Sequence, residues 1–427
     1  MTSFLDRYAD IAGPDVIAGL RQLGSHFAGQ RVVHVNSTRE GGGVAEILRW
    51  LLPSMQDVGL DAVWETIEGD ETFFEMTKAL HNGMQGQEVT LTTSMMAAYE
   101  EANRRAAERL GPLLREADYV YIHDPQPAML RNLIGPTKGH WVWRCHIDCA
   151  DRSRAAWKFL QPLVETYDAS VYSMPQFAPT LKHAQFIIAP SIDPLSDKNR
   201  PLARSEIDGV RREYKLDPGR PLLVQVSRFD RFKDPVGVIK AFRLVRRYFP
   251  VQLVLAGGGA TDDPEGATVL KAVQEEAAGD DDIHVLFLPG DAHLEVNALQ
   301  RAADIIIQKS TREGFGLTVT EGMWKGKPVI GGNAGGIRLQ VFDYQTGFLV
   351  DTPEGAAQRI LYLLRHPARI RKQGEQAREF VRENFLLTRH LREYLTLLLG
   401  LSMGLSDRIY AQAPTADDKA ATVTKPV

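Results

Sequence analysis

The chain alternates short apolar runs with longer segments of helical pattern, and this alternation narrows its fold more than any other feature. The runs lie at residues 31–37, 61–67, 119–124, 140–148, 170–174, 185–191, 222–229, 251–259, 283–290, 304–310, 327–333 and 346–351. Runs that are apolar throughout predict strands buried on both faces, each followed by a covering helix. The first six and the last six form two series. We therefore predict an α/β protein with two doubly wound parallel sheets.

The domain limits follow from length and from local composition. A chain of 427 residues fits two domains of roughly 200 residues each. The boundary is expected in 189–202, which is rich in Pro, Asp and Ser. We predict a first Rossmann-like domain over 1–195 and a second over 196–385. A helix over 386–410 is expected to pack back towards the first domain, and 411–427 to be a disordered tail.

Composition excludes several classes of protein. A net charge of -4 argues against a general polyanion binder, so no nucleic-acid partner is expected. No apolar run approaches the ~18 to 20 residues that span a membrane, and the first residues lack the pattern of a signal peptide. The expected compartment is the cytoplasm. The expected partners are small-molecule substrates, and the sequence also allows a homodimer.

The segment "WRCHIDCAD" contains four residues that could bind a metal, which are Cys145, His146, Asp148 and Cys149. Zinc sites pair two ligand clusters, and no second cluster follows this one. No metal site and no disulfide framework are therefore predicted. The cysteines are interpreted as small buried groups, and the polar residues as part of a ligand-binding cleft.

Glycines after the first predicted strand mark a candidate ligand loop, since ligands of open α/β sheets bind beyond the carboxyl ends of the strands. Gly41, Gly42 and Gly43 precede a helix that is expected to begin near Val44. Such a loop lets a ligand approach the backbone, and the helix start favours an anion. A flexible turn explains the glycines equally well. The spacing also does not match the G-x-G-x-x-G pattern of dinucleotide sites.

Two cations follow the first strand of the second domain. Arg228 and Lys233, in "QVSRFDRFKDP", suit an anion with several oxygens, such as a diphosphate. A solvated basic turn, paired with Asp230 and Asp234, is the alternative interpretation.

The stretch "TREGFGLTVTEGMWKG" (311–326) combines a glycine loop with a predicted helix start. Gly314 and Gly316 allow tight backbone conformations, and the helix is expected to begin at Leu317. Its first free amides, those of Leu317 and Thr318, would then face a phosphate.

Two glutamates flank this loop. Glu321 lies about one turn into the helix, and helical side chains lean towards the helix start, so it can reach a hydroxyl beside the phosphate, such as that of a ribose. Glu313 would approach the ligand from the other side. A core helix explains Val319 and Met323 but not these two carboxylates, so a binding site is favoured.

These motifs resemble those of the retaining GT-B glycosyltransferases related to sucrose-phosphate synthase and glycogen synthase, over about Val32 to Asp351. The segments "HVNSTREGGGVAEILRWLLP", "HDPQP", "WRCHID" and "TREGFGLTVTEGMWKGKPVIGG" are more closely similar to the trehalose glycosyltransferring synthases. The resemblance implies two Rossmann-like domains that face each other across a cleft. It also implies an enzyme that reversibly makes trehalose from a nucleotide-activated glucose, such as UDP-glucose or ADP-glucose, and free glucose.

The resemblance also implies roles for the matching residues. Arg228 and Lys233 would hold the diphosphate, Glu313 the donor sugar and Glu321 the ribose. The implied donor-binding set is Gly42, Gly43, Arg228, Lys233, Glu313, Gly314, Phe315, Gly316, Leu317, Thr318 and Glu321. The implied acceptor-binding set is Asn36, His123, Arg144, His146 and Asp148. The implied catalytic set is Arg228, Lys233, Glu313 and His123. The chain departs from the wider family at 308–310, where a Pro-Ser pair is common, and at Gly322, where an alanine is common.

The implied chemistry determines what the site must stabilise. Breaking the sugar–phosphate bond leaves an oxocarbenium-like sugar and an anionic diphosphate, which fixed cations and amide dipoles stabilise. The acceptor is expected to attack the same face, and the departing phosphate to take its proton. No tightly bound cofactor is expected, and Mg²⁺ is allowed but not required.

Three alternatives remain open from the sequence. A retaining trehalose phosphorylase would use free phosphate in place of the nucleotide and would not need Glu321 as a ribose ligand. A transferase with another sugar acceptor, such as a sugar phosphate, is ranked lower because the first domain has no extra Arg/Lys cluster. A nucleotide-sugar sensor without activity is the third, since a fold alone does not give a function.

Overall fold

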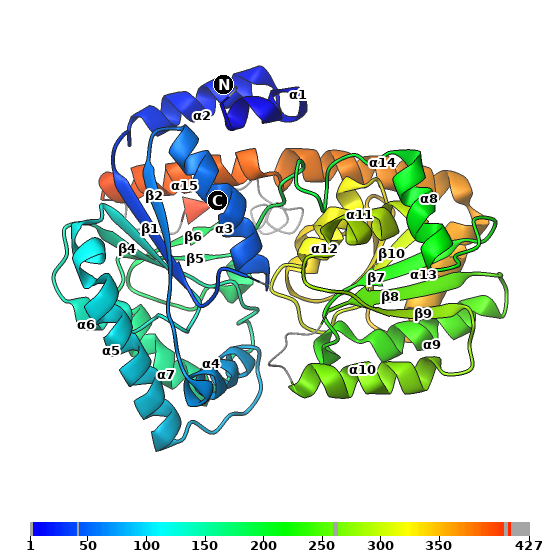
Figure 1. The fold of residues 1–427 in the computed structure, drawn as a ribbon, viewed down its shortest axis with the longest axis horizontal. Helices are drawn as coiled ribbons and strands as arrows, with labels where there is room; N and C mark the ends of the chain where they lie inside the picture. The colour runs from blue at the N-terminus through cyan, green and yellow to red at the C-terminus, as the bar shows by residue number, and fades with distance from the viewer. Residues whose placement is uncertain (1–2, 41, 259–263, 405–408, 411–427) are drawn as a thin grey trace, which may run out of the picture. The chain divides into compact units, whose positions relative to one another are not determined.

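The structure is a computed structural model that describes residues 3–40, 42–258, 264–404 and 409–410 (Figure 1). The chain forms two compact units. Unit 1 contains Met1–Pro190 and Leu387–Val427, and unit 2 contains Ser191–Leu386. The expectations for Gly41, for residue 259 at the end of a predicted strand and for the tail at 411–427 lie outside the described residues.

Unit 1 is built on a parallel sheet with the strand order β13-β6-β5-β4-β3-β1-β2. Its strands are β1 (Arg31–Asn36), β2 (Asp61–Thr66), β3 (Tyr119–His123), β4 (His140–Arg144), β5 (Ala169–Tyr172), β6 (Ala184–Ile187) and β13 (Ile409–Tyr410). The central strands β3 and β5 are buried along their whole length, as expected for strands covered on both faces.

Helices cover both faces of this sheet. The helices of unit 1 are η1 (Leu5–Tyr8), α1 (Ala9–Ala12), α2 (Pro14–Ser25), α3 (Gly42–Asp57), α4 (Glu71–Met84), α5 (Thr93–Glu116), α6 (Leu130–Ile134), α7 (Arg154–Val164), η2 (Pro175–Phe177) and α15 (Leu387–Ser402). Helix α15 packs against α2 and α3, while α5 packs against α4 and α6 (Figure 1). Helix α15, near the end of the chain, therefore lies beside two helices from its beginning.

Unit 2 has a second parallel sheet, with the strand order β12-β11-β10-β7-β8-β9. Its strands are β7 (Leu222–Val226), β8 (Gln252–Gly257), β9 (Ile283–Phe287), β10 (Ile305–Gln308), β11 (Val329–Gly332) and β12 (Gly347–Val350). The order reverses at β7, whose neighbours are β8 and β10. In open α/β sheets, such a reversal leaves a crevice at the carboxyl ends of the two diverging strands.

The helices of unit 2 also lie on both faces of the sheet. They are α8 (Arg204–Glu213), η3 (Arg231–Lys233), α9 (Pro235–Arg246), α10 (Pro264–Ala277), α11 (His293–Ala302), α12 (Leu317–Trp324), η4 (Gly335–Leu339), α13 (Pro353–Arg365) and α14 (Pro367–Asn384). Helices α9 and α10 lie on one side of the sheet, and α11 and α12 on the other (Figure 1). Buried apolar side chains of α9 and α13 form a single core with β7, β10 and β11.

The two predicted parallel sheets are confirmed, and each of the twelve apolar runs contains a strand. The helix expected over 386–410 is α15, which is shorter and spans Leu387–Ser402, and a break separates it from α14. The break has a physical cause, because the Phe385 carbonyl accepts a hydrogen bond from the Ile192 amide at 2.9 Å, and Ile192 forms a parallel bridge with Leu386. Phe385 also packs edge-on against Phe315, with 5.3 Å between ring centroids, which holds this turn in place.

No helix in the part of the chain that the structure describes combines the length and the apolar character that crossing a membrane requires.

Candidate active site

A partly buried ion pair lies where β7 and β10 end. The two strands are neighbours in the sheet, so the residues that follow them meet at one edge. The Lys233 ammonium, at the end of η3, lies 2.6 Å from Oε2 of Glu313, and the two side chains are 17% and 11% exposed. Ser310 Oγ donates to the same carboxylate oxygen at 3.1 Å. The site thus brings together two residues of the predicted donor set that are 80 positions apart in sequence.

The neighbouring residues show why Lys233 is not part of a simple basic turn. Asp234, which the alternative interpretation paired with the basic residues, caps α9 by accepting from the Gly237 amide and pairs with Lys309. Its carboxylate is therefore engaged elsewhere. Arg228 does contact Asp230, with 3.2 Å between Nη2 and Oδ2, but its side chain is 54% exposed. The Arg228 guanidinium remains accessible to a ligand.

The Gly-Phe-Gly loop leads into α12, which begins at Leu317 as the sequence predicts. Gly316 has φ +87°, a left-handed conformation that glycine adopts without strain. No side chain of the described residues caps the amino end of this helix. Its first backbone N–H groups are therefore available to an anion. The Phe315 side chain is only 5% exposed, and its ring packs against that of Phe385, which holds the loop in place.

Gln340 is not among the predicted site residues, but its side chain is hydrogen-bonded to the Gly-Phe-Gly loop. Its side-chain nitrogen donates to the carbonyl oxygens of Phe315 at 2.6 Å and Gly316 at 3.5 Å. Its side-chain oxygen accepts from the Thr320 hydroxyl at 2.6 Å. A carbonyl and the following N–H point in opposite directions in a planar peptide, so these bonds set the direction of the loop amides. In the sequence Gln340 is one of two polar residues, with Arg338, in the run "GGIRLQVF", which carries no functional motif.

Replacing Gln340 with leucine is expected to raise the KM for a phosphate-bearing donor about tenfold, because buried carbonyls lose their donor and the loop relaxes. The matched control is Gln373→Leu. Gln373 is also buried, but its side-chain nitrogen and oxygen have no hydrogen-bond partner among the described residues. Steady-state kinetics of both variants test this. Equal KM values for Gln340→Leu and Gln373→Leu would contradict the role of Gln340.

Glu321, on α12, carries a buried carboxylate. It is 1% exposed, and neither of its side-chain oxygens has a hydrogen-bond partner in the described part of the protein. The Lys198 ammonium lies 3.7 Å from Oε1, which is an ion-pair distance. Buried polar groups are normally hydrogen-bonded, so these oxygens have capacity for a ligand with hydroxyl donors.

The predicted glycine loop of unit 1 differs from the expectation. Helix α3 begins at Gly42, so Gly42 and Gly43 form its first turn and do not precede it. Gly42 is exposed, with φ +77°, and a Cβ there would meet no atom of the described residues within 4 Å. The positive φ requires glycine, and the open space leaves the helix start approachable.

Three histidines of unit 1 form a chain of imidazoles. His34 Nδ1 lies 2.9 Å from His123 Nε2, and His123 Nδ1 lies 3.0 Å from His146 Nε2. His123 is 1% exposed, and both of its ring nitrogens are occupied by other imidazoles. Burial, with smaller contributions from neighbouring charges, holds the pKa of His123 well below its usual value. This geometry suits a residue that orients His146 and does not favour direct proton transfer by His123.

Acid is expected to destabilise the protein through these imidazoles. Burial lowers the pKa of His34 from 6.5 to about 3. Between those values the unfolded chain binds the proton and the folded chain does not. The free energy of unfolding therefore falls as the pH drops, by up to about 1.4 kcal/mol per pH unit for each such group. Burial raises the pKa of Asp124 and of Glu393 to about 7, and these two carboxyls act in the opposite sense.

Urea unfolding between about pH 6.5 and pH 4.5 measures this slope. His34→Phe keeps a ring stacked on Tyr121 and removes one titrating group. The slope of the unfolding free energy against pH should therefore decrease by up to about 1.4 kcal/mol per pH unit, the contribution of one proton. An unchanged slope would contradict the account.

Arg144 is the most deeply buried of the predicted acceptor residues. It ends β4, beside His123 on β3, and its side chain is 0% exposed. None of its three guanidinium nitrogens has a hydrogen-bond partner among the residues described. The Arg144 charge lowers the pKa of the neighbouring His146, although burial is the larger cause of that shift.

The other predicted acceptor residues are bonded within unit 1. Asn36 accepts from the Trp64 indole N–H at 2.7 Å, and Asp148 accepts from the Ala150 amide at 3.3 Å. Both are about 3% exposed. Asn36, His123, Arg144, His146 and Asp148 therefore all lie near the carboxyl edge of the unit 1 sheet, but buried or bonded in place.

The two cysteines are small buried groups, as expected. Cys145 and Cys149 are buried, and their sulfur atoms lie 3.9 Å apart without a disulfide. Among the described residues, no group of three or more His, Cys, Asp or Glu side chains is arranged to hold a metal ion.

Comparisons with known proteins agree with the fold and with these motifs. The family model "Trehalose synthase, N-terminal domain" matches residues 34–179, and the model "Glycosyl transferases group 1" matches 206–380. A trehalose synthase of Thermococcus litoralis is 45% identical over 399 residues, which cover 92% of this chain and 96% of the relative.

Two more distant proteins place this match in context. A trehalose phosphorylase of Pleurotus pulmonarius is 27% identical over 94% of this chain and 61% of its own length. The structure of a sucrose-phosphate synthase from Thermosynechococcus elongatus superposes with a TM-score of 0.66 at 18% identity, covering 88% of this chain and 99% of the other. That likeness establishes the GT-B fold.

Proposed function

The chain belongs to the trehalose synthase family of glycosyltransferases, and on that premise we propose that it transfers glucose from a nucleoside diphosphate glucose to free glucose. The products are trehalose, the nucleoside diphosphate and a proton. The observation that carries the proposal is the Lys233–Glu313 pair at the edge of β7 and β10. The start of α12, which no described side chain caps, follows Glu313 closely in the chain. The same helix carries Glu321, whose carboxylate oxygens have no hydrogen-bond partner among the described residues.

The donor half of the mechanism follows from these charges. Lys233 and Arg228 stabilise the negative charge that grows on the diphosphate as the sugar–phosphate bond breaks. The free amides of Leu317 and Thr318 add to this stabilisation, because they point at the anion without reorganising. Glu321 accepts hydrogen bonds from the ribose. The positive charge is supplied by side chains, so Mg²⁺ is allowed but not needed.

Glu313 positions the donor glucose and keeps Lys233 oriented. Its Oε2 is already engaged by Lys233 and Ser310, which leaves it poorly placed for covalent attack on the sugar. We therefore assign it to sugar binding and electrostatics. The acceptor hydroxyl attacks the face from which the phosphate leaves, and the phosphate takes its proton, so the configuration at the anomeric carbon is retained.

The acceptor is free glucose, which we propose binds beside His146 and Asp148 of unit 1. The chain of imidazoles from His34 through His123 holds the His146 ring in one orientation. The neighbouring Asp124 carboxylate accepts from the His146 amide at 2.7 Å, which fixes the backbone at this point. We place the reaction in the cytoplasm and expect it to be reversible.

A panel of donors and acceptors tests the proposal. The protein is incubated with UDP-, ADP- or GDP-glucose together with glucose or glucose 6-phosphate, and separately with trehalose and inorganic phosphate. A nonreducing disaccharide from at least one nucleotide donor and free glucose is the expected result. No product with any nucleotide donor, together with glucose 1-phosphate from trehalose and phosphate, would favour a phosphorylase instead.

A further inference from the structure

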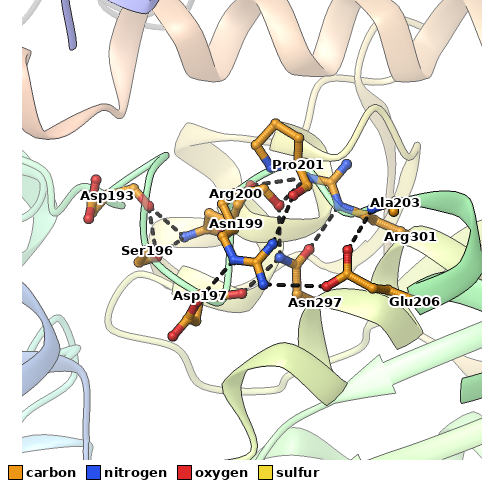
Figure 2. A network of polar contacts seen from close by, with 10 residues as sticks. All are labelled: Asp193, Ser196, Asp197, Asn199, Arg200, Pro201, Ala203, Glu206, Asn297 and Arg301. Carbon is orange, nitrogen blue, oxygen red and sulfur yellow. Dashed lines mark hydrogen bonds and ion pairs between the residues drawn. The ribbon is translucent and has the colours of Figure 1, made fainter. Parts of the chain in front are cut away.

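The segment Asp193–Pro201, called here the 193–201 segment, lies in the stretch where the domain boundary was expected, and it is bonded into unit 2 (Figure 2). The Asp193 carbonyl accepts from the Ser196 hydroxyl at 2.9 Å and from the Asn199 side-chain nitrogen at 3.0 Å. The Asn199 nitrogen also donates to Ser196 Oγ at 3.2 Å. These bonds close the segment on itself, so it has one defined shape.

Helix α11 fixes this shape to unit 2. Asn297 is fully buried, and its side-chain nitrogen donates to the carbonyls of Asp197 at 2.8 Å and Arg200 at 2.9 Å. Arg301 donates to the carbonyls of Asn199 at 3.0 Å and Arg200 at 2.9 Å. It also donates to the Asn297 side-chain oxygen at 2.9 Å, so the two side chains hold each other (Figure 2).

A further bond links the segment to α12, the helix that carries Glu321. The Lys325 ammonium, directly after α12, donates to the Asn199 side-chain oxygen at 2.9 Å and to the Glu321 carbonyl at 3.2 Å. Because Asn199 is 1% exposed and Lys325 8% exposed, this link is shielded from water. The segment and the backbone of Glu321 therefore form one rigid assembly.

Lys198 lies within this assembly and faces Glu321. Its ammonium is 3.7 Å from Glu321 Oε1, and its side chain is 21% exposed against 1% for Glu321. The distance is too long for a hydrogen bond, so Lys198 balances the charge of the carboxylate without using its lone pairs. An ion pair of this kind stabilises a fold weakly, because desolvation offsets the attraction. The fixed position of Lys198 is better explained if it keeps the Glu321 carboxylate in place for a ligand.

We propose that Lys198 is a positioning residue of the nucleotide subsite, which holds the charged Glu321 carboxylate where it accepts hydrogen bonds from ribose hydroxyls. The inference rests on the proposed function, since it requires a nucleotide donor. It extends that function by assigning the 193–201 segment to the nucleotide subsite. Asn297 and Arg301 of α11 hold the 193–201 segment in place and do not touch the ligand.

Isothermal titration calorimetry with UDP and ADP, and with their 2′,3′-dideoxy forms, tests this proposal. The ratio of ribo to dideoxy affinity isolates the hydroxyl contacts. We expect the wild type to prefer the ribo form about tenfold. Lys198→Met should lose most of this preference while its dideoxy affinity stays within about threefold of the wild type. Lys198→Arg, which keeps the charge, should restore part of the preference. Lys240→Met, a change of an exposed lysine on α9, should leave the ratio unchanged.

A double-mutant cycle adds a second readout. Glu321→Gln removes the carboxylate charge that Lys198 holds, so Lys198→Met should weaken ribonucleotide binding no further in that background. Dideoxy binding by each variant shows that the protein is folded. A Lys198→Met protein that keeps the wild-type ribo/dideoxy ratio would overturn the inference, as would additive effects in the cycle.

The outcomes also separate this inference from the proposed function. Failure of the wild type to bind either nucleotide would remove the nucleotide-dependent function itself. Nucleotide binding without any ribo preference would leave the transferase intact but overturn the assignment of Glu321, and with it that of Lys198. If the wild type and the Lys198→Met variant prefer the ribo over the dideoxy nucleotide equally, only the role of Lys198 would be overturned.

Discussion

Lys233→Met is expected to lower kcat for glucosyl transfer about 10³-fold, the loss typical when a fixed group that stabilises developing negative charge is removed. The Lys233 ammonium is held 2.6 Å from Glu313 in a poorly exposed site, where its charge acts with little screening by water. Methionine keeps the apolar stem and removes the charge. Steady-state kinetics with a nucleotide donor and glucose measure the effect.

Two further variants separate catalysis from stability in this experiment. Lys233→Met leaves Glu313 buried without its counter-charge, so the double variant Lys233→Met/Glu313→Gln should regain stability but not activity. Lys309→Met is the control, because Lys309 is a buried lysine that is likewise paired with a carboxylate, that of Asp234. The Lys309→Met variant should be less stable than the wild type, but its kcat should fall less than tenfold. A Lys233→Met enzyme within tenfold of the wild type would contradict the assignment.

Gly336→Ala is expected to reduce kcat/KM for the donor about 100-fold, because it displaces the Gly-Phe-Gly loop by a fraction of an ångström or more. A Cβ on Gly336 would lie 2.5 Å from Phe315 Cα and 2.8 Å from the Gly314 carbonyl oxygen. Both are backbone atoms, which cannot turn aside as a flexible side chain can. The Gly336 amide also donates to the Glu313 carbonyl at 3.1 Å, so a shift is transmitted to the ion pair.

Gly355→Ala is the matched control for this change. A Cβ on Gly355 would meet its nearest atoms at 3.5 and 3.9 Å, which is ordinary contact. This variant should keep wild-type activity and unfold at the same temperature or slightly higher. If Gly336→Ala were as active as Gly355→Ala, the backbone position of the loop would not control the reaction.

The sequence predicted the elements whose causes are local. Continuous apolar runs such as 222–229 allow little but a buried parallel strand, and Gly316 marks the start of α12 because only a glycine takes its positive φ without strain. Once the strands are predicted, the sequence also shows which charged residues directly follow the end of a strand. The two glutamates and the two cations of the donor set can therefore be singled out from the sequence alone.

The features that the sequence did not reveal depend on register and side-chain reach. Whether Lys233 meets Asp234 or Glu313 is decided by the pairing of β7 with β10. The link from His34 to His123 likewise depends on β1 and β3 being neighbours. Gln340 belongs to no motif, and its role is visible only from the carbonyls it contacts.

Gly322 illustrates a departure from the family that the structure explains. A Cβ at this position of α12 would lie 2.8 Å from Ile306 Cγ1 on β10. The bulky isoleucine occupies the space that an alanine methyl would need, so the helix packs closely on the strand through a glycine. The departure therefore concerns packing beneath the site and not the charges within it.

Transfer of labelled glucose, followed by NMR spectroscopy, tests the central claim most directly. The protein is given nucleoside diphosphate glucose with ¹³C in the sugar, together with unlabelled glucose and no added phosphate. The account predicts that label appears in one ring of trehalose with the α configuration, at the rate at which nucleoside diphosphate is released. Release of label only as free glucose, or transfer only after inorganic phosphate is added, would contradict it.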